Sequence, residues 1–169
     1  KSLPIPLDAD LVKSIMLQLP FELTWGQKIA LFQVLKDMEK THSMQRLLEW
    51  DVGTWKTVVA LIATMHAIRQ SEILECKIQV AIMAPTEILA RQHFLSMQQM
   101  LFEFGLSSEL LVWSTGAKKK TEIKALLKSW SLDVIIGTHA LIQEDVFFYN
   151  LWFVVVDEQH RFWVRQREV

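Results

Sequence analysis

The segment FVVVDE, residues 153–158, decides the fold, because it joins four apolar residues to two carboxylates. Two similar runs occur earlier, IQVAIMA at residues 78–84 and DVII at residues 133–136. Continuous runs rich in β-branched residues are typical of central strands in a parallel sheet that is covered on both faces. Stretches with helical spacing lie between these runs. The alternation of strand and helix therefore predicts an α/β domain with a mostly parallel sheet and helices on both faces.

Hydrophobic spacing predicts the remaining elements. We expect helices that contain residues 11–19, 29–38, 56–70, 87–102 and 123–127, and further strands at residues 44–48 and 110–113. The 169 residues suit one domain, and the net charge of −1 means that any binding of nucleic acid must be local. Cys76 is the single cysteine, which excludes an intramolecular disulfide framework and fits a reducing compartment. No apolar run reaches the length of about 20 residues that spans a bilayer.

The segment WDVGTWKT, residues 50–57, matches a phosphate-binding loop, G-x-x-x-x-G-K-[ST], in its spacing and in its last two residues. The ammonium group of Lys56 suits the terminal phosphates of a nucleotide, and the hydroxyl of Thr57 suits Mg²⁺. Backbone N–H groups at a helix start also bind phosphate. However, both consensus glycines are tryptophans, Trp50 and Trp55, and an indole there should obstruct a nucleotide. The alternative is an ordinary helix start with a solvated lysine.

The carboxylates Asp157 and Glu158 follow an apolar strand, which is the Walker B arrangement. In it, Asp157 holds Mg²⁺ and Glu158 polarises the attacking water. Alone, the pair could be two surface carboxylates. Together with Lys56 and Thr57 upstream, it forms the second half of one Mg·ATP site. The amide of Gln27 suits the edge of adenine, although alone it indicates a helix-surface residue.

Two further segments follow predicted strands, Pro85-Thr86-Glu87 and Gly137-Thr138-His139. Both place a hydroxyl and backbone N–H groups at a helix start, which suits contacts with phosphodiesters. Thr86 and Thr138 are also typical helix N-caps, and the two roles are compatible. The basic run Lys118–Lys120 is either a solvated face or a contact with nucleic acid.

In combination, these motifs resemble superfamily 2 helicases, and most closely the RecG-type ATP-dependent DNA helicases. The matching segments follow one another in order: LPFELTxxQK, RLLxxDVGTxKTVVA, MAPTEILAxQHF, STGxxK, IIGTHALIQEDVxF and LxFVVVDEQHRFxVxQR. The resemblance covers residues 20–168. Transcription–repair coupling translocases are the nearest relatives of that family and share its chemistry.

The resemblance implies a role for each motif. Residues that bind ATP would be Phe21, Gln27, Trp50, Asp51, Val52, Gly53, Thr54, Trp55, Lys56 and Thr57. Thr57 and Asp157 would hold Mg²⁺, and the catalytic residues would be Lys56, Glu158 and His160, the last coupling hydrolysis to movement. The DNA backbone would contact Pro85, Thr86, Glu87, Gly137, Thr138 and His139.

The resemblance also implies an organisation and a function. Residues 20–169 would be the first RecA-like motor lobe, cut after its motif II, and residues 1–19 would connect it to a preceding wedge domain. A second lobe with an arginine finger would complete the motor. The implied enzyme acts in the bacterial cytoplasm, without a membrane, and uses ATP and Mg²⁺ to remodel stalled forks and branched DNA. The alternatives are a transcription–repair coupling translocase and an inactive remnant that only binds nucleic acid.

Most of the tryptophans occur at positions where the family has the same residue, glycine. Glycine is the usual residue of the family at the positions of Trp50, Trp55, Trp130, Trp152 and Trp163, and at Trp25 or its neighbour Gly26. Lys56, Thr57, Asp157 and Glu158 are all intact, whereas a decayed enzyme should also lose catalytic residues. We therefore expect these codons to be UGA, which some bacterial lineages read as glycine. If the tryptophans are genuine, the inactive remnant is the better reading.

Overall fold

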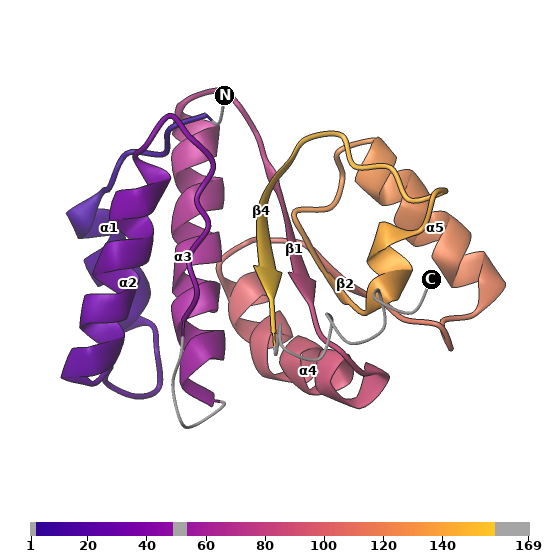
Figure 1. Cartoon of the computed structure of the whole chain (residues 1–169), viewed down its shortest axis with the longest axis horizontal. Coiled ribbons are helices and arrows are strands. Elements are labelled where there is room, and N and C mark those ends of the chain that lie inside the picture. Colours follow the sequence, from indigo (N-terminus) through magenta and orange to yellow (C-terminus); the bar gives the residue numbers. More distant parts are fainter. Residues whose placement is uncertain (1–2, 49–53, 158–169) are drawn as a thin grey trace. The chain divides into compact units, whose positions relative to one another are not determined.

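The computed structural model describes residues 3–48 and 54–157, which divide between two compact units, residues 1–77 and residues 78–169 (Figure 1). Each unit is described by itself. Among the described residues, no helix combines the length and apolar character that crossing a bilayer requires.

The first unit is built from three helices: α1 (Ala9–Leu17), α2 (Trp25–Met38) and α3 (Thr54–Ile73). Both α1 and α2 have capped starts. The carboxylate of Asp8 accepts the N–H groups of Asp10 and Leu11, and the hydroxyl of Thr24 accepts that of Gln27. Helices α1 and α2 both pack against α3. The predicted helices at residues 11–19, 29–38 and 56–70 are thus confirmed.

A buried histidine ties the start of the chain to α3. The Nε2 atom of His66 accepts the backbone N–H of Asp8 at 3.1 Å, and the amide of Gln70 donates to the Asp8 carboxylate at 3.0 Å. Burial lowers the pKa of His66 to about 4, so the ring is neutral near pH 7 and can accept this bond. Residues before α1 are therefore part of the packed unit.

The predicted strand at residues 44–48 is wrong, because these residues form neither a strand nor a helix. Most of them are exposed, and Leu47 keeps 65% of its surface. Arg46 instead lies on the side of α2, where its Nε atom is 2.5 Å from the Asp37 carboxylate. The side chain of Arg46 is thus paired locally, and residues 44–48 join no strand of the described sheet.

The second unit is a parallel sheet with helices between its strands. Its elements are β1 (Gln79–Met83), α4 (Glu87–Glu103), β2 (Ser108–Leu111), α5 (Ala117–Lys128), β3 (Val134–Gly137), the 3₁₀ helix η1 (His139–Ile142) and β4 (Leu151–Val156). The strand order is β2-β3-β1-β4, and every pair is parallel. The predicted α/β fold is confirmed, and so are the strands at residues 78–84 and 133–136. The strand expected at residues 110–113 begins and ends two residues earlier.

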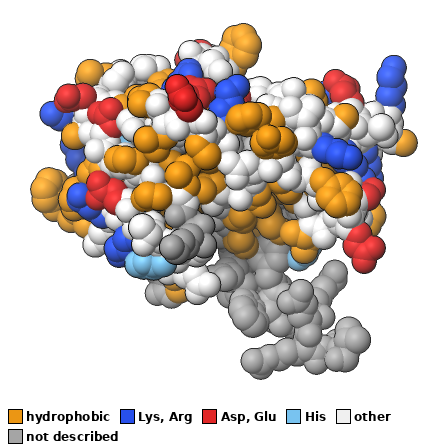
Figure 2. Space-filling view, turned by 90° about the horizontal axis from the view of Figure 1, so that it is seen from above, with side chains coloured by type: hydrophobic (Ala, Val, Ile, Leu, Met, Phe, Trp, Pro, Cys, Tyr) orange, Lys and Arg blue, Asp and Glu red, His pale blue; other side chains and the backbone are white. Residues whose placement is uncertain are grey.

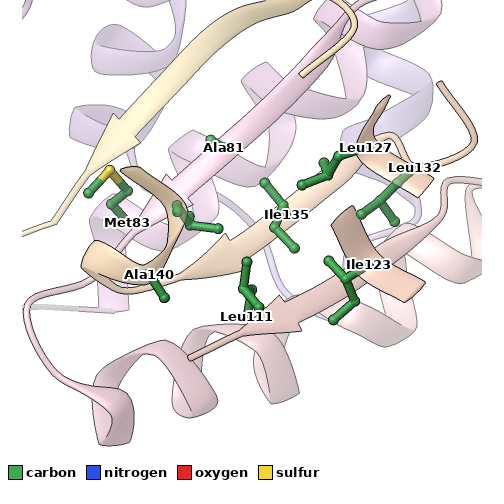
Figure 3. Packing of buried hydrophobic residues seen from close by; sticks show 9 residues of the cluster. Ala81, Met83, Leu111, Ile123, Leu127, Leu132, Ile135 and Ala140 are labelled. Atoms are coloured by element: carbon green, nitrogen blue, oxygen red, sulfur yellow. The ribbon is translucent and has the colours of Figure 1, made fainter. Parts of the chain in front are cut away.

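The two faces of the sheet are covered by different helices. Side chains of one face pack against α5 and η1 in a buried cluster that includes Ala81, Met83, Leu111, Ile135, Ile123 and Leu127 (Figure 3). On the other face, Ala84 and Val112 pack against Ala90 of α4. Strand residues alternate between faces, which explains why neighbouring positions of β1 are all buried.

Strand β4 differs from the prediction of a strand covered on both faces. It lies at one edge of the described sheet, and only Phe153 is buried in it, whereas Leu151, Val154 and Val156 are at least two-fifths exposed. Its pairing with β1 also contains an irregularity. Gln79 pairs with Leu151 but Val80 pairs with Phe153, so Trp152 is an extra residue.

Gln79 is a polar residue buried in the middle of this unit, 1% exposed. Its amide nitrogen donates to the carbonyls of Leu127 and Leu132, at 2.9 and 3.0 Å. Its amide oxygen accepts the N–H groups of Tyr149 and Asn150, at 2.8 and 3.1 Å. Every hydrogen-bonding site of the amide is used, so its burial is compatible with stability.

Three helices end in the same backbone motif. The second residue past the helix has a positive φ in each case, with values of 77° at Gly105 after α4, 65° at Trp130 after α5 and 55° at Glu75 after α3. The next N–H donates to the carbonyl five residues back: Leu106 to Leu101, Ser131 to Leu126 and Cys76 to Ser71. This is the Schellman ending, whose left-handed residue is usually glycine.

Candidate functional site

The carboxylate predicted to hold Mg²⁺ lies where the carboxyl ends of the parallel strands meet. Asp157 directly follows β4, and its backbone N–H donates to the carbonyl of Met83 at the end of β1, at 2.8 Å. Its side chain is 20% exposed. Carboxylate oxygens are ligands that Mg²⁺ prefers, so this residue fits the predicted cation. Glu158 and His160 lie outside the described residues.

A histidine that the sequence analysis did not single out contacts this carboxylate. The Nε2 atom of His93, from α4, lies 2.8 Å from Oδ2 of Asp157, and the imidazole is 14% exposed. His93 belongs to the segment MAPTEILAxQHF, but nothing in the local sequence connects it to a residue that follows a different strand. Only the packing of α4 beside the sheet brings the two together.

The segment after β1 begins α4. The hydroxyl of Thr86 caps this helix by accepting the N–H of Leu89 at 3.3 Å, as predicted for an N-cap. Glu87 faces the loop after β2, where its carboxylate accepts the N–H of Ser114 at 3.0 Å and the hydroxyl of Ser114 at 2.6 Å. These two bonds lower the pKa of Glu87. Its carboxylate therefore fixes a neighbouring loop, and the adjacent residues Thr86 and Ile88 are exposed.

The segment after β3 is more tightly packed. A Cβ atom on Gly137 would lie 2.2 Å from the backbone oxygen of Leu111, so no other residue fits there. The hydroxyl of Thr138 caps η1 by accepting the N–H of Ala140 at 3.5 Å, and Thr138 is only 4% exposed. His139 is exposed. Of these three residues, His139 therefore has the side chain most accessible to an external ligand.

The residues predicted to bind the nucleotide lie in the first unit. Lys56 and Thr57 are in the first turn of α3, which begins at Thr54, and both are partly exposed. The first N–H groups of a helix have no partner within the helix, which suits them to phosphate. The backbone of residues 50–53 and the side chains of Thr54 and Trp55 lie outside the part of the chain that the structure describes.

Gln27 is not the helix-surface residue that its sequence alone indicated, because it is 7% exposed. Its amide oxygen accepts the N–H of Thr24 at 2.8 Å, while its own N–H donates to the Thr24 hydroxyl. This is a capping box, which the pattern T-x-x-Q could have predicted. Phe21, the other residue expected beside adenine, is 45% exposed.

Charges at the surface are mixed. On the face shown in Figure 2, acidic and basic side chains are interspersed with exposed hydrophobic ones. Within the basic run, Lys119 pairs with Glu109, and Lys120 donates to the carbonyl of Trp113 and lies over its ring. Two of the three lysines thus have partners inside the protein.

The comparisons with known proteins agree with the resemblance inferred from the motifs. The profile of the DEAD/DEAH box helicase family matches residues 26–169. The ATP-dependent DNA helicase RecG of Thermotoga maritima is 43% identical over 166 residues, 98% of this chain, and that of Aquifex aeolicus is 38% identical over all 169. A solved structure of RecG bound to a three-way DNA junction covers 95% of the chain, with a TM-score of 0.82 and 41% identity.

The chain spans about a fifth of the length of these relatives, 20% and 21% of the two proteins and 21% of the solved chain. The resemblance to RecG and the RecA-like character of the sheet are confirmed by these matches. On the match of residues 26–169, the chain belongs to the DEAD/DEAH box helicase family.

Proposed function

We propose that the protein to which this chain belongs is a RecG-type DNA helicase that uses ATP and Mg²⁺ to remodel stalled forks and branched DNA. The observation that carries the proposal is the 41% identity, at a TM-score of 0.82, to RecG bound to a three-way junction. Cytoplasmic location in a bacterium is part of the proposal, and the bacterial origin of these relatives supports it.

The expected domain organisation is part of the proposal as well. Residues 20–169 would form the first RecA-like lobe, and residues 1–19 would lead into it from a wedge domain. Helix α1, within residues 1–19, packs against α3. A second lobe would supply the arginine that stabilises the transferred phosphoryl group.

The proposed chemistry divides the site residues into two groups. Lys56 and Thr57, at the start of α3, would bind the phosphates and the cation, with Gln27 and Phe21 beside the base. Asp157 would hold Mg²⁺, and Glu158 would polarise the attacking water. Thr86, Glu87 and residues 137–139 would lie along the DNA backbone, so that binding depends little on sequence and falls steeply with salt.

Two substitutions in the full-length protein with glycine at positions 50 and 55 test the catalytic assignment. Glu158→Gln should keep Mg·ATP binding and abolish DNA-stimulated hydrolysis, because an amide keeps the shape of the acid but cannot polarise water. Lys56→Ala should weaken nucleotide binding itself, because the phosphates lose their cationic partner. Lys13→Ala, on the exposed side of α1, is the matched control. Normal hydrolysis by Glu158→Gln would contradict the assignment.

A specific observation favours an inactive nucleic-acid-binding protein as the second candidate. Trp50 and Trp55 replace both glycines of the phosphate loop. If both are present in the natural protein, ATP should give no stabilisation and no hydrolysis, whereas branched DNA should still bind. Titration of the native protein with ATP and with a three-way junction therefore separates the two candidates.

A further inference from the structure

Helix α4 connects two places at the carboxyl edge of the sheet. Its N-cap, Thr86, follows β1, and about two helical turns later His93 reaches Asp157 at the end of β4. The contact joins residues 64 positions apart and lies within one compact unit. The two side chains are largely but not fully buried, at 14% and 20% exposed.

The chemistry of the two groups fixes the direction of this hydrogen bond. An ionised carboxylate can only accept, so Nε2 of His93 carries the hydrogen and donates it to Oδ2. The main chain of Asp157 is held separately, through its N–H to Met83. A carboxylate has about four lone-pair sites, so a single bond at Oδ2 orients the group without using all of them.

We propose that His93 is a positioning residue that orients the Asp157 carboxylate for the divalent cation. This inference rests on the proposed function, which assigns Asp157 to the cation. Carboxylates that bind metals are themselves held by hydrogen bonds, and loss of such a partner typically weakens metal binding by about 10–100-fold. His93 supplies such a bond from a helix that is anchored elsewhere.

The anchoring of α4 gives the arrangement a further consequence. Glu87, in the first turn, is bonded twice to Ser114, and Thr86 caps the same turn. Thr86 and Glu87, two of the residues proposed to lie along DNA, and the residue that orients Asp157 therefore belong to one helix and its N-cap. A shift of α4 along its axis would change both contacts together.

The test uses the full-length protein with Trp50→Gly and Trp55→Gly, so that the phosphate loop can accept a nucleotide. Binding of Mn²⁺, in place of Mg²⁺, is measured by electron paramagnetic resonance with a non-hydrolysable ATP analogue. His93→Leu should weaken Mn²⁺ binding by about 10-fold or more. His93→Gln, whose amide can donate from a similar position, should restore most of it. Gln92→Leu, on the exposed side of the same helix turn, should have no effect.

Steady-state kinetics adds a second measurement. The Mg²⁺ concentration for half-maximal hydrolysis should rise by about 10-fold in His93→Leu, with a smaller change in kcat at saturating Mg²⁺. Equal Mn²⁺ affinity in His93→Leu and the parent would overturn the positioning role alone. No nucleotide-dependent Mn²⁺ binding by the parent would overturn the proposed function and this inference together. A loss that His93→Gln does not restore would also overturn it, since the hydrogen bond would not be the cause.

Discussion

Helices α4 and α5 end with the same backbone motif, but the residues with positive φ differ greatly in size. Both finish in a Schellman ending, with a 2.8 Å bond from Leu106 to Leu101 in one and a 3.0 Å bond from Ser131 to Leu126 in the other. The left-handed residue is Gly105 after α4 and Trp130 after α5. The backbone requires the same conformation at both positions, but only glycine adopts it without steric cost.

Trp130 compensates for its conformation with a contact that glycine lacks. Its indole stacks on Tyr149, with ring centroids 4.8 Å apart and planes 6° apart. Such a pair contributes about 0.5–1.5 kcal/mol, whereas the left-handed conformation costs about 1–2 kcal/mol. Position 130 is therefore a glycine position by its backbone, as the family pattern indicated. Trp152, the extra residue in β4, is a second tryptophan at a backbone irregularity.

The two helix ends show that the need for glycine must be assessed separately at each tryptophan position. Glu75 shows that this chain tolerates a residue other than glycine in the same ending. Trp25 is an exposed first residue of α2, and nothing in its surroundings calls for glycine. Backbone conformation thus supports glycine at position 130, whereas the space that a nucleotide needs supports glycine at positions 50 and 55.

The largest effect is expected in the phosphate loop, where tryptophan replaces a family glycine as it does at position 130. Trp50→Gly with Trp55→Gly, in the full-length protein, should create ATP binding that the tryptophan-containing protein lacks. At an ATP concentration of 100 times Kd, this binding should raise the free energy of unfolding by about 2.7 kcal/mol. Thermal unfolding with and without Mg·ATP measures the gain.

A control substitution and the codons of the gene complete that test. Trp113→Gly, in an exposed position, should confer no ATP binding. In the gene, the codons of Trp50, Trp55, Trp130, Trp152 and Trp163 should be UGA, and that of Trp113 should be UGG. Native protein whose peptides carry tryptophan at positions 50 and 55 would end the codon hypothesis and leave the inactive remnant.

An intermediate effect is expected at the end of α4. Gly105→Ala should lower the free energy of unfolding by about 1–2 kcal/mol, because alanine must adopt a left-handed conformation. Denaturant titration measures the change. In the exposed interior of the same helix, Gln99→Ala should instead be more stable than Gln99→Gly, by about 1 kcal/mol. Unchanged stability of Gly105→Ala would show that this helix end can relax.

The smallest effect is expected at the end of α5. Trp130→Gly and Trp130→Ala both lose the stacking on Tyr149. The difference between their free energies of unfolding therefore reports the backbone conformation alone. Trp130→Gly should be the more stable by about 1 kcal/mol. The same denaturant titration applies, with Tyr149→Ala as a measure of the lost stacking. If Trp130→Ala were equally stable, the two helix ends would not be equivalent.

Sequence patterns predicted most of the second unit because its runs are unambiguous. VII in β3 and VAIM in β1 are apolar throughout, and the structure buries them on both sides. The same reasoning failed for residues 44–48, where the apolar spacing is short and Arg46 finds a local partner in Asp37. It also overestimated the burial of β4, which lies at the edge of the described sheet, since edge and central strands can have the same composition.

The candidate site was predictable only where one motif carries the chemistry. Asp157 and the helix start at Lys56 could be read from local spacing. The contact of His93 with Asp157 could not, because it depends on how α4 packs beside a strand 64 residues away in sequence. Likewise, no pattern within either segment records the burial of Thr138 or the close approach of β2 to β3 at Gly137.

The buried amide of Gln79 has a consequence for the order of folding. Its four hydrogen bonds reach residues that are 48, 53, 70 and 71 positions later in the chain. During synthesis, β1 is made before any of these partners exist. Closing such long loops costs chain entropy before the bonds repay it. We therefore expect β1 to be locked in place late and cooperatively, when the turn before β4 arrives and completes the set.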